Sequence, residues 1–431
     1  MVSTAAGARG HDNVMLRAVL RRLGPGVITG AADDDPSGIA TYSQAGAQFG
    51  FGLAWTLILT LPLMAAIQII SACIGWETRA GLAKNIAAQL PNFVVYLLIL
   101  LLVTANTINI AADLAAMGDA LRLVIGGPAV LYALVFGAGC LIAEIIVPYH
   151  TYAGYLKFLT LGLFAYVATA FRVHIPWGEV ALATVLPKVA LDREALLTIV
   201  AIFGTTISPY LFFWQASQEA EESRLSYRRL HGAQERRLGA QFKHIAADTW
   251  TGMTVSNLVG WFIIVTTAAT LNAHGVTKID TAAQAAEALR PIAGNLAFVL
   301  FAAGIIGTGL LAVPVLAGSA AYGVAEAFGL RGSLELPANR ALGFYGTVGA
   351  ATMAGAALTL TKIDPIAMLF WTAVINGVVA VPIMLVMMAI VSSRHGRRVF
   401  SLPRWLRILG WLSAALMTAA AALLFGASLT G

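Results

Sequence analysis

The sequence predicts an all-α protein that crosses a lipid bilayer about eleven times. Of its 431 residues, 59% are hydrophobic and 11% are charged, whereas soluble domains carry about 25% charged residues. The mean hydropathy is +0.80. The apolar runs have the length of membrane helices, about 20 residues, and lack the short alternating segments of an outer-membrane barrel. We therefore expect a polytopic helical membrane protein.

The apolar spans follow a short cytoplasmic N-terminal arm at 1–22. Several of them, including the first, the sixth and the eighth, are longer than one straight crossing requires. In chain order the eleven predicted spans cover 24–49, 52–75, 93–120, 128–148, 151–172, 194–220, 249–271, 293–326, 341–360, 365–392 and 404–428.

The basic residues indicate topology and give no sign of a nucleic-acid partner. With the N-terminus inside, 19 Lys and Arg residues fall on inner segments and 7 on outer segments. Cytoplasmic loops carry the excess of positive charge. We therefore expect a multi-pass protein of the inner (plasma) membrane with a cytoplasmic N-terminus and an outer C-terminus. Cys73 and Cys140 lie in apolar runs, so a disulfide or cysteine–metal site is not expected.

The first span contains an acid-rich break, Asp33-Asp34-Asp35-Pro36-Ser37-Gly38. Each carboxylate at bilayer depth costs roughly 2.5–3.5 kcal/mol on insertion scales. Pro36 removes a backbone donor, and Gly38 loosens the chain. Within lipid, such a break is tolerated where it lines a cavity or is buried in protein. We predict a cation site here; an extramembrane turn with solvated acids is the alternative.

The sixth span has a matching break, Gly204-Thr205-Thr206-Ile207-Ser208-Pro209-Tyr210. The two breaks are five spans apart, and an odd offset gives them opposite orientations in the membrane. Paired discontinuous helices in two halves of a chain indicate an inverted-repeat transporter with a site near the midplane. Freed carbonyls and carboxylates supply the hard oxygen ligands that such a site offers to a cation. Two ordinary proline kinks are the alternative.

Both breaks resemble those of the NRAMP family of divalent-metal transporters, and the resemblance covers spans one to ten. The segments that carry it are Gly24-Pro25-Gly26-Val27-Ile28, Asp35-Pro36-Ser37-Gly38, Gln44 to Phe51, Ile67 to Ala72 with Gly75, Asn109 to Ala115, and Thr205 to Pro209. The resemblance implies a leucine-transporter-like inverted repeat of five plus five helices. It also implies transport of divalent metal by alternating access, often with protons.

The implied domains are a first five-helix repeat at 23–172, a second at 194–392 and an eleventh helix at 404–428. The second repeat contains a charged cytoplasmic loop at 223–247. We interpret this loop as a solvated connector, with a regulatory or lipid-binding role as the alternative.

The resemblance also implies the metal site. The family's first break reads Asp-Pro-Gly-Asn, in which the Asp and Asn bind metal. Asp35 matches the Asp, whereas Gly38 stands where the Asn would be. In the sixth helix, Thr205 occupies the place of a carbonyl ligand and Ser208 that of a Met thioether. The expected metal-site residues are Asp35, Ser208, Thr205, Asp34 and Gly38.

Loss of the thioether changes the expected substrate. A thioether favours softer transition metals, and a hydroxyl in its place leaves a site made of oxygen atoms. Mg²⁺ keeps several waters and is held by one or two carboxylates, so we expect Mg²⁺, with Mn²⁺ next. The alternatives are a small organic cation or amino-acid-like solute on the same fold, proton-coupled Mn²⁺ or Fe²⁺ uptake, and a non-transporting metal sensor.

Weak or absent proton coupling is expected. Related coupled transporters carry an Asp and a Glu one turn apart on the third helix, but here Ala116 follows Asp113. Asp119 lies six residues on and projects elsewhere. These two acids are the candidate proton path. The family's two sixth-helix His positions hold Tyr210 and Gln215.

Further polar residues are expected in the cavity wall around the metal. Gln44, for example, either lines the cavity or joins two helices. The full set is Asp33, Ser37, Gln44, Tyr210, Gln215 and Asn376. The sequence has no P-loop, Ser-His-Asp set, HExxH or CxxC pattern, so we expect neither an enzyme nor a cofactor beyond the transported ion. The oligomeric state stays open, and a monomer is compatible with the sequence.

Overall fold

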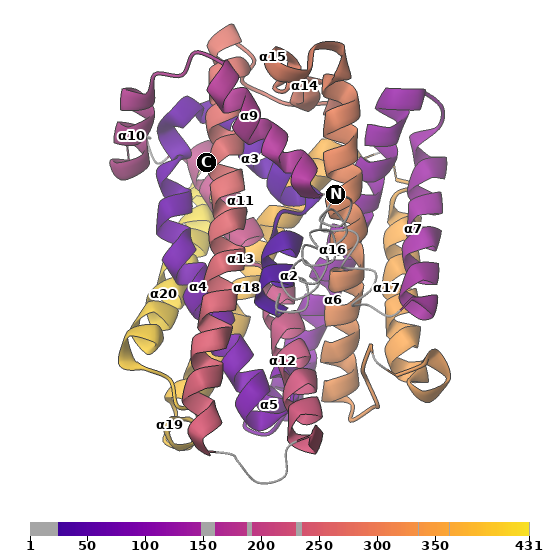
Figure 1. Ribbon diagram of the computed structural model, residues 1–431, viewed down its shortest axis with the longest axis vertical. Helices are drawn as coiled ribbons and strands as arrows, with labels where there is room; N and C mark the ends of the chain where they lie inside the picture. The colour runs from indigo at the N-terminus through magenta and orange to yellow at the C-terminus, as the bar shows by residue number, and fades with distance from the viewer. Residues whose placement is uncertain are drawn as a thin grey trace, which may run out of the picture.

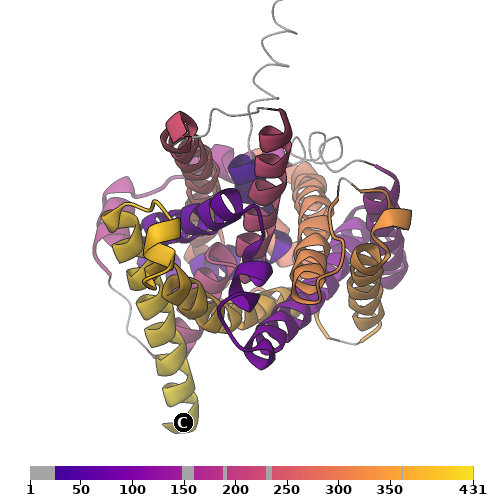
Figure 2. The same cartoon turned by 90° about the horizontal axis from the view of Figure 1, so that it is seen from below.

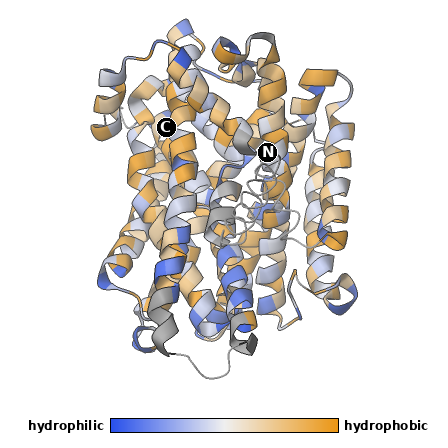
Figure 3. Ribbon diagram, in the orientation of Figure 1, coloured by the Kyte–Doolittle hydropathy of each residue, from blue (hydrophilic) through white to orange (hydrophobic). Residues whose placement is uncertain are grey.

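The protein is described by a computed structural model that covers residues 25–147, 160–187, 192–229, 235–334, 336–361 and 363–430. Within these ranges every regular element is a helix, which confirms the all-α prediction. The predicted arm at 1–22 lies outside the described residues. Apolar residues cover most of the length of the helices, and polar residues gather at the upper and lower ends (Figure 3).

The long helices stand side by side along the long axis of the molecule (Figure 1). They are α4 (Trp55–Thr78), α6 (Asn92–Ile125), α7 (Ala129–Ile146), α11 (Arg193–Thr206), α12 (Pro209–Arg229), α13 (Glu235–Thr270), α16 (Ala297–Ala327), α17 (Leu342–Leu358), α18 (Pro365–Ser392) and α20 (Arg404–Thr430). Among the described residues, 8 stretches are long and apolar enough to cross a membrane, with α11 and α12 counted together. The other predicted spans fall on α2 with α3, on α9 and on α17, so the count of eleven stays a prediction.

Shorter helices fill the centre and cap both ends. They are α2 (Pro25–Asp33), α3 (Pro36–Phe49), α5 (Leu82–Ala87), α9 (Phe164–Arg172), α10 (Trp177–Val185), α14 (Ala282–Glu287), α15 (Arg290–Ala293) and α19 (Gly396–Val399), with 3₁₀ turns at Gly50–Leu53, Thr160–Leu163, Asn272–His274, Gly294–Leu296 and Ala338–Arg340. In Figure 1, α14 and α15 lie at the upper end, and α5 and α19 lie at the lower end.

Both predicted helix breaks are present. The first lies between α2 and α3, and the second lies between α11 and α12. Pro36 and Pro209 are each the first residue of the following helix, a position where the missing N–H costs little. Asp35 caps α3, since its side chain accepts a hydrogen bond from the Gly38 N–H at 2.8 Å.

The charged segment 223–247, expected to be a connector, is largely helical. Helix α12 continues to Arg229, and α13 begins at Glu235. Residues 230–234 lie outside the described ranges. The segment is rich in Glu, Gln, Arg and Lys, which are good helix formers, so the helices extend well past the apolar spans.

The two broken helices run through the middle of the bundle. Helix α2 packs against α13 and α12, while α3 packs against α13, α18 and α11. Around them α6 packs on α16, α12 on α4 and α11 on α18. Helix α20 lies at the edge of the bundle (Figure 2). The acid-rich break is therefore enclosed by protein, as a break at membrane depth requires.

Candidate cation site

Asp35 is a buried acid of the first break, with 1% of the residue exposed, and both of its carboxylate oxygens have hydrogen-bond partners. Its Oδ1 accepts hydrogen bonds from Ser37 Oγ at 2.6 Å and Gly38 N at 2.8 Å. Its Oδ2 accepts from Asn109 Nδ2 at 3.1 Å and lies 3.5 Å from the Tyr210 hydroxyl oxygen. No basic side chain in the described ranges forms a salt bridge with Asp35. The buried carboxylate is held by neutral donors alone, and this arrangement favours a cation beside it.

The two breaks face each other. A Cβ atom on Gly38 would lie 3.1 Å from Thr205 Oγ1, so α3 and the end of α11 meet at this point. The Tyr210 hydroxyl donates to the Ala32 carbonyl at 3.1 Å and so joins α12 to α2. Ser208 Oγ lies 2.7 Å from the Gly204 carbonyl oxygen and 2.9 Å from that of Thr205. The structure thus brings Asp35, Gly38, Thr205 and Tyr210 together, with Ser208 in the facing break.

Asp33 and Asp34 turn toward α13. Ser256 Oγ lies 2.6 Å from Asp33 Oδ2 and 3.0 Å from Asp34 Oδ1. A hydroxyl has one hydrogen to donate, so Ser256 alone cannot satisfy both acids. Asp33 Oδ1 is buried and has no hydrogen-bond partner in the part of the chain that the structure describes. The first break therefore contains a buried carboxylate oxygen, Asp33 Oδ1, that lacks a hydrogen-bond donor.

The two acids of α6 have different surroundings, as the spacing along a helix predicts. Asp113 is buried, and neither of its carboxylate oxygens has a hydrogen-bond partner among the described residues. It is close enough to Asp35 for the two carboxylates to interact electrostatically. Asp119 instead pairs with Arg122 and lines a separate cavity.

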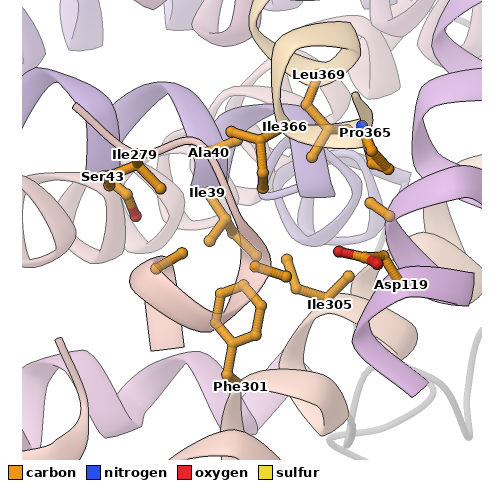
Figure 4. A pocket seen from close by; sticks show the side chains of 13 residues that line it. Ile39, Ala40, Ser43, Asp119, Ile279, Phe301, Ile305, Pro365, Ile366 and Leu369 are labelled. Carbon is orange, nitrogen blue, oxygen red and sulfur yellow. The ribbon is translucent and has the colours of Figure 1, made fainter. Parts of the chain in front are cut away.

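This cavity lies between α3, α6, α14, α16 and α18 (Figure 4). Its volume is about 10 Å³, enough for about one water molecule. Ile39 and Ala40 form part of its wall, about one turn along α3 from Asp35. The cavity is mostly apolar, with Ser43 and Asp119 as its polar side chains. The cavity therefore lies above the break, and the acids at 33–35 are not among its lining residues.

Two predicted cavity residues hold helices together elsewhere. Gln44 Oε1 accepts from Ile279 N at 2.9 Å, and its Nε2 donates to the Thr277 carbonyl at 3.3 Å. Gln44 lies nine residues after Asp35, roughly 13 Å along the helix, so it closes the upper end and does not contact the break. Gln215 Nε2 donates to Thr249 Oγ1 at 2.9 Å and joins α12 to α13.

Sequence reasoning missed two contacts of the acids. Asn109, absent from the predicted site residues, donates to Asp35. Its spacing of four residues from Asp113 places both on one helix face, and this signal was available. Ser256 is a small polar residue more than 200 positions from the acids it contacts, and the sequence holds no local signal for it.

Within the described ranges, no group of three or more His, Cys, Asp or Glu side chains is arranged to hold a metal ion. A cation at the breaks would depend on carboxylate, hydroxyl, amide and backbone oxygens together. Such mixed oxygen sets suit hard cations.

The sequence profile of the family described as "Natural resistance-associated macrophage protein-like" (Nramp) matches residues 26–427. The chain belongs to the Nramp family. Similar curated proteins include the "Divalent metal cation transporter MntH" of Klebsiella pneumoniae strain 342, 27% identical over 314 residues that make up 68% of each chain. The protein of the same name from Yersinia pestis strain Pestoides F is 27% identical over 308 residues, 68% of this chain and 69% of the relative.

Solved transporter structures share the fold. The Eremococcus coleocola manganese transporter, in complex with an aromatic bis-isothiourea compound, superposes with a TM-score of 0.72 at 16% identity, over 95% of this chain and 87% of that one. Mhp1, a nucleobase-cation-symport-1 family transporter, has a TM-score of 0.56 at 14% identity, over 94% and 92%. These matches confirm the predicted leucine-transporter-like fold with its broken first and sixth helices.

Proposed function

We propose that the protein carries divalent cations across the plasma membrane, Mg²⁺ first and Mn²⁺ next, by alternating access with weak or no proton coupling. Membership of the Nramp family supports transport, and it supports the expectation that the chain is not an enzyme. Relatives are named divalent metal cation transporters. The excess of positive charge on the segments assigned to the inside supports a cytoplasmic N-terminus.

The observation that carries the proposal is the facing pair of breaks around Asp35. Asp35 supplies the carboxylate, and Thr205 and Ser208 supply oxygen atoms from the opposite break. With Ser208 where the family has a thioether, no soft ligand is left to favour a transition metal. Mg²⁺ keeps several of its waters. The unpartnered oxygens of Asp33, Asn109 and Asp113 are suited to accept hydrogen bonds from these waters.

Alternating access requires one end to open at a time, and in the structure Asp33, Asp34 and Asp35 are all buried. At the lower end, Glu326 accepts from Gly81 N at 2.8 Å and Lys84 N at 3.2 Å, which ties α16 to α5. At the upper end, Gln44 ties α3 to the segment before α14. We propose that spans 1, 2, 6 and 7 move against the rest and release these contacts in turn.

The surroundings of Asp113 support weak proton coupling. Ala116 leaves this acid without the second carboxylate one turn away that coupled relatives carry. Asp119 is occupied by Arg122. A proton released by metal binding at Asp35 therefore has no continuous row of acids to follow along α6.

A second candidate is Mn²⁺ as the main substrate. The Eremococcus coleocola relative is described as a manganese transporter. Competition separates the two candidates: excess Mg²⁺ suppresses Mn²⁺ flux when Mg²⁺ is the main substrate, and leaves it unchanged when the site selects Mn²⁺.

The proposal is tested by flux into proteoliposomes loaded with a Mg²⁺-sensitive dye. Wild-type protein is expected to admit Mg²⁺ and Mn²⁺, and Asp35→Ala to abolish both fluxes. Asp280→Ala is the control, because Asp280 is an exposed acid in a loop. Absence of any divalent flux, with uptake of an organic solute, overturns the proposal. A pH-sensitive dye in matched vesicles tests coupling, and acidification that follows metal uptake contradicts it.

A further inference from the structure

Asn376 is a buried side chain with nothing to bind. It lies in the middle of α18, and only 1% of the residue is exposed. Neither its Nδ2 nor its Oδ1 has a hydrogen-bond partner in the part of the chain that the structure describes. Burying an amide without partners is unfavourable, and most buried polar side chains in native proteins are paired. Such a group requires an explanation other than packing.

Asn376 lies on the face of α18 that looks toward the first break. Ile366 and Leu369 line the cavity beside Ile39 and Ala40 of α3 (Figure 4). Residues at spacings of three and four share a helix face, and Asn376 follows Leu369 by seven. Helix α18 also packs directly on α3 and α11. The cavity-lining face of α18 therefore continues to Asn376.

The depth of Asn376 matches that of the second break. A Cβ on Gly204 would overlap the Ala373 carbonyl and the Gly377 amide, so the two helix backbones touch here. Gly204 directly precedes Thr205, and Asn376 directly precedes Gly377. Leu369 and Asn376 are separated by about 10 Å along the helix, and Ile39 and Asp35 by about 6 Å. Asn376 thus lies near the level of Thr205 and Asp35.

The direction of the Asn376 side chain places its amide nearer to the level of Asp35 than its Cα atom is. In an α-helix, the Cα–Cβ bond tilts toward the N-terminus. The N-terminal end of α18 is the end at which Pro365, Ile366 and Leu369 line the cavity. The amide of Asn376 is thereby directed back toward the level of Asp35 and does not point away along the helix.

If Asn376 had a purely structural role, its amide would form a hydrogen bond with a neighbouring helix, and no such bond is present among the described residues. Interhelical amide hydrogen bonds are common in membranes, but the atoms of α11 that meet α18 here belong to Val200 and Gly204. The nearby Thr372 hydroxyl already donates to the Leu369 carbonyl of its own helix. The described neighbours leave the amide available to a ligand.

We propose that Asn376 is a further ligand-binding residue of the cation site and sets its affinity for hydrated divalent cations. Its amide oxygen accepts a hydrogen bond from a water of the bound Mg²⁺, or binds the ion directly, since amide oxygens suit hard cations. Gly38 stands where related proteins have an amide ligand, and Asn376 provides an amide from the opposite side of the site. This inference rests on the proposed function.

The test compares Asn376→Leu, Asn376→Asp and the control Thr372→Val in proteoliposomes, with Asp35→Ala as the inactive reference. Leucine keeps the branched shape and the number of heavy atoms and removes the acceptor; aspartate keeps an acceptor oxygen. Asn376→Leu is expected to raise the KM for Mg²⁺ about tenfold, the effect of losing one hydrogen bond to a charged group, with little change in maximal flux. Asn376→Asp is expected to keep or lower the KM, and Thr372→Val to match the wild type.

Melting of the purified variants with and without Mg²⁺ separates ligand binding from folding. Asn376→Leu is expected to melt no lower than the wild type in the absence of metal, and to gain less stability from Mg²⁺. An unchanged KM and an unchanged gain from Mg²⁺ in Asn376→Leu, while Asp35→Ala is inactive, overturn this inference and leave the proposed function standing. Absence of flux and of Mg²⁺ or Mn²⁺ stabilisation in the wild type overturns both.

Discussion

At the scale of single residues, the site depends on the absence of a side chain at Gly38. Thr205 Oγ1 would lie 3.1 Å from a Cβ at this position, closer than unstrained packing allows. Gly38 also supplies one of the N–H donors that orient Asp35. The glycine therefore lets the two breaks approach and keeps the carboxylate in place.

Gly38→Ala is expected to push Thr205 away and weaken cation binding several-fold. Thr205→Ala in the same chain removes the hydroxyl in the way and is expected to restore most of the affinity, because the proposed ligand is the Thr205 carbonyl. The measurement is the KM for Mg²⁺ of both single variants and the double variant. A double variant as weak as Gly38→Ala alone would show that the hydroxyl itself binds the ion.

Site residues could be predicted from the sequence where a local pattern marked them. The acids at 33–35 stand out at membrane depth, so their place at a break could be predicted from the sequence alone. The side chains that contact them come from α6, α12 and α13. Contacts between distant segments depend on how the helices pack against one another, and this packing cannot be deduced from a single sequence.

At the scale of elements, α2 is bound to α13 along its whole length. A Cβ on Gly26 would lie within 2.9 Å of Thr249 and Asp248, and one on Gly30 would overlap the backbone of Gly252. Asp248 Oδ2 also accepts from Gly26 N at 2.7 Å. Small residues let membrane helices approach this closely. We infer that α2 and the adjoining part of α13 move as one body.

Gly30→Ala tests this packing, because the added methyl group has no room against Gly252. Overpacking of this kind costs about 1–3 kcal/mol, so we expect a lower melting temperature in detergent and slower flux. Gly139→Ala is the matched control in α7, where nothing lies within 4 Å of the added atom. Equal melting of both variants would mean that α2 separates from α13 easily.

The elements themselves were predictable in kind and less so in extent. Proline and acidic residues marked both breaks, since each removes or disfavours continuous helix in an apolar run. The extension of α12 to Arg229 and the start of α13 at Glu235 were not expected. Hydropathy identifies the part of a helix that contacts lipid, but it does not show how far the helix continues into water.

At the scale of the whole molecule, the acids of the first break are buried, and polar contacts join helices above and below them. The upper contacts include Gln48 Nε2 to Glu194 Oε2 at 2.6 Å and Asn272 Nδ2 to the Ala47 carbonyl at 2.7 Å. The lower contacts include Ser223 Oγ to the Trp76 carbonyl at 2.9 Å. Each end is held by a few polar contacts and by helix packing, which suits an end that opens and closes.

Labelling of a cysteine in the wall of the cavity in Figure 4 measures how accessible this cavity is from the upper end. Ser43 is buried in the cavity wall, and the native Cys73 and Cys140 are buried, so Ser43→Cys is expected to react slowly with a membrane-impermeant maleimide. Adding Gln44→Ala removes the bonds to Thr277 and Ile279, which join α3 to the segment before α14. We expect labelling from the upper side to become several-fold faster. Gln89→Ala, an exposed glutamine at the lower end, is the control; equal rates in all three backgrounds would show that other contacts hold the upper end closed.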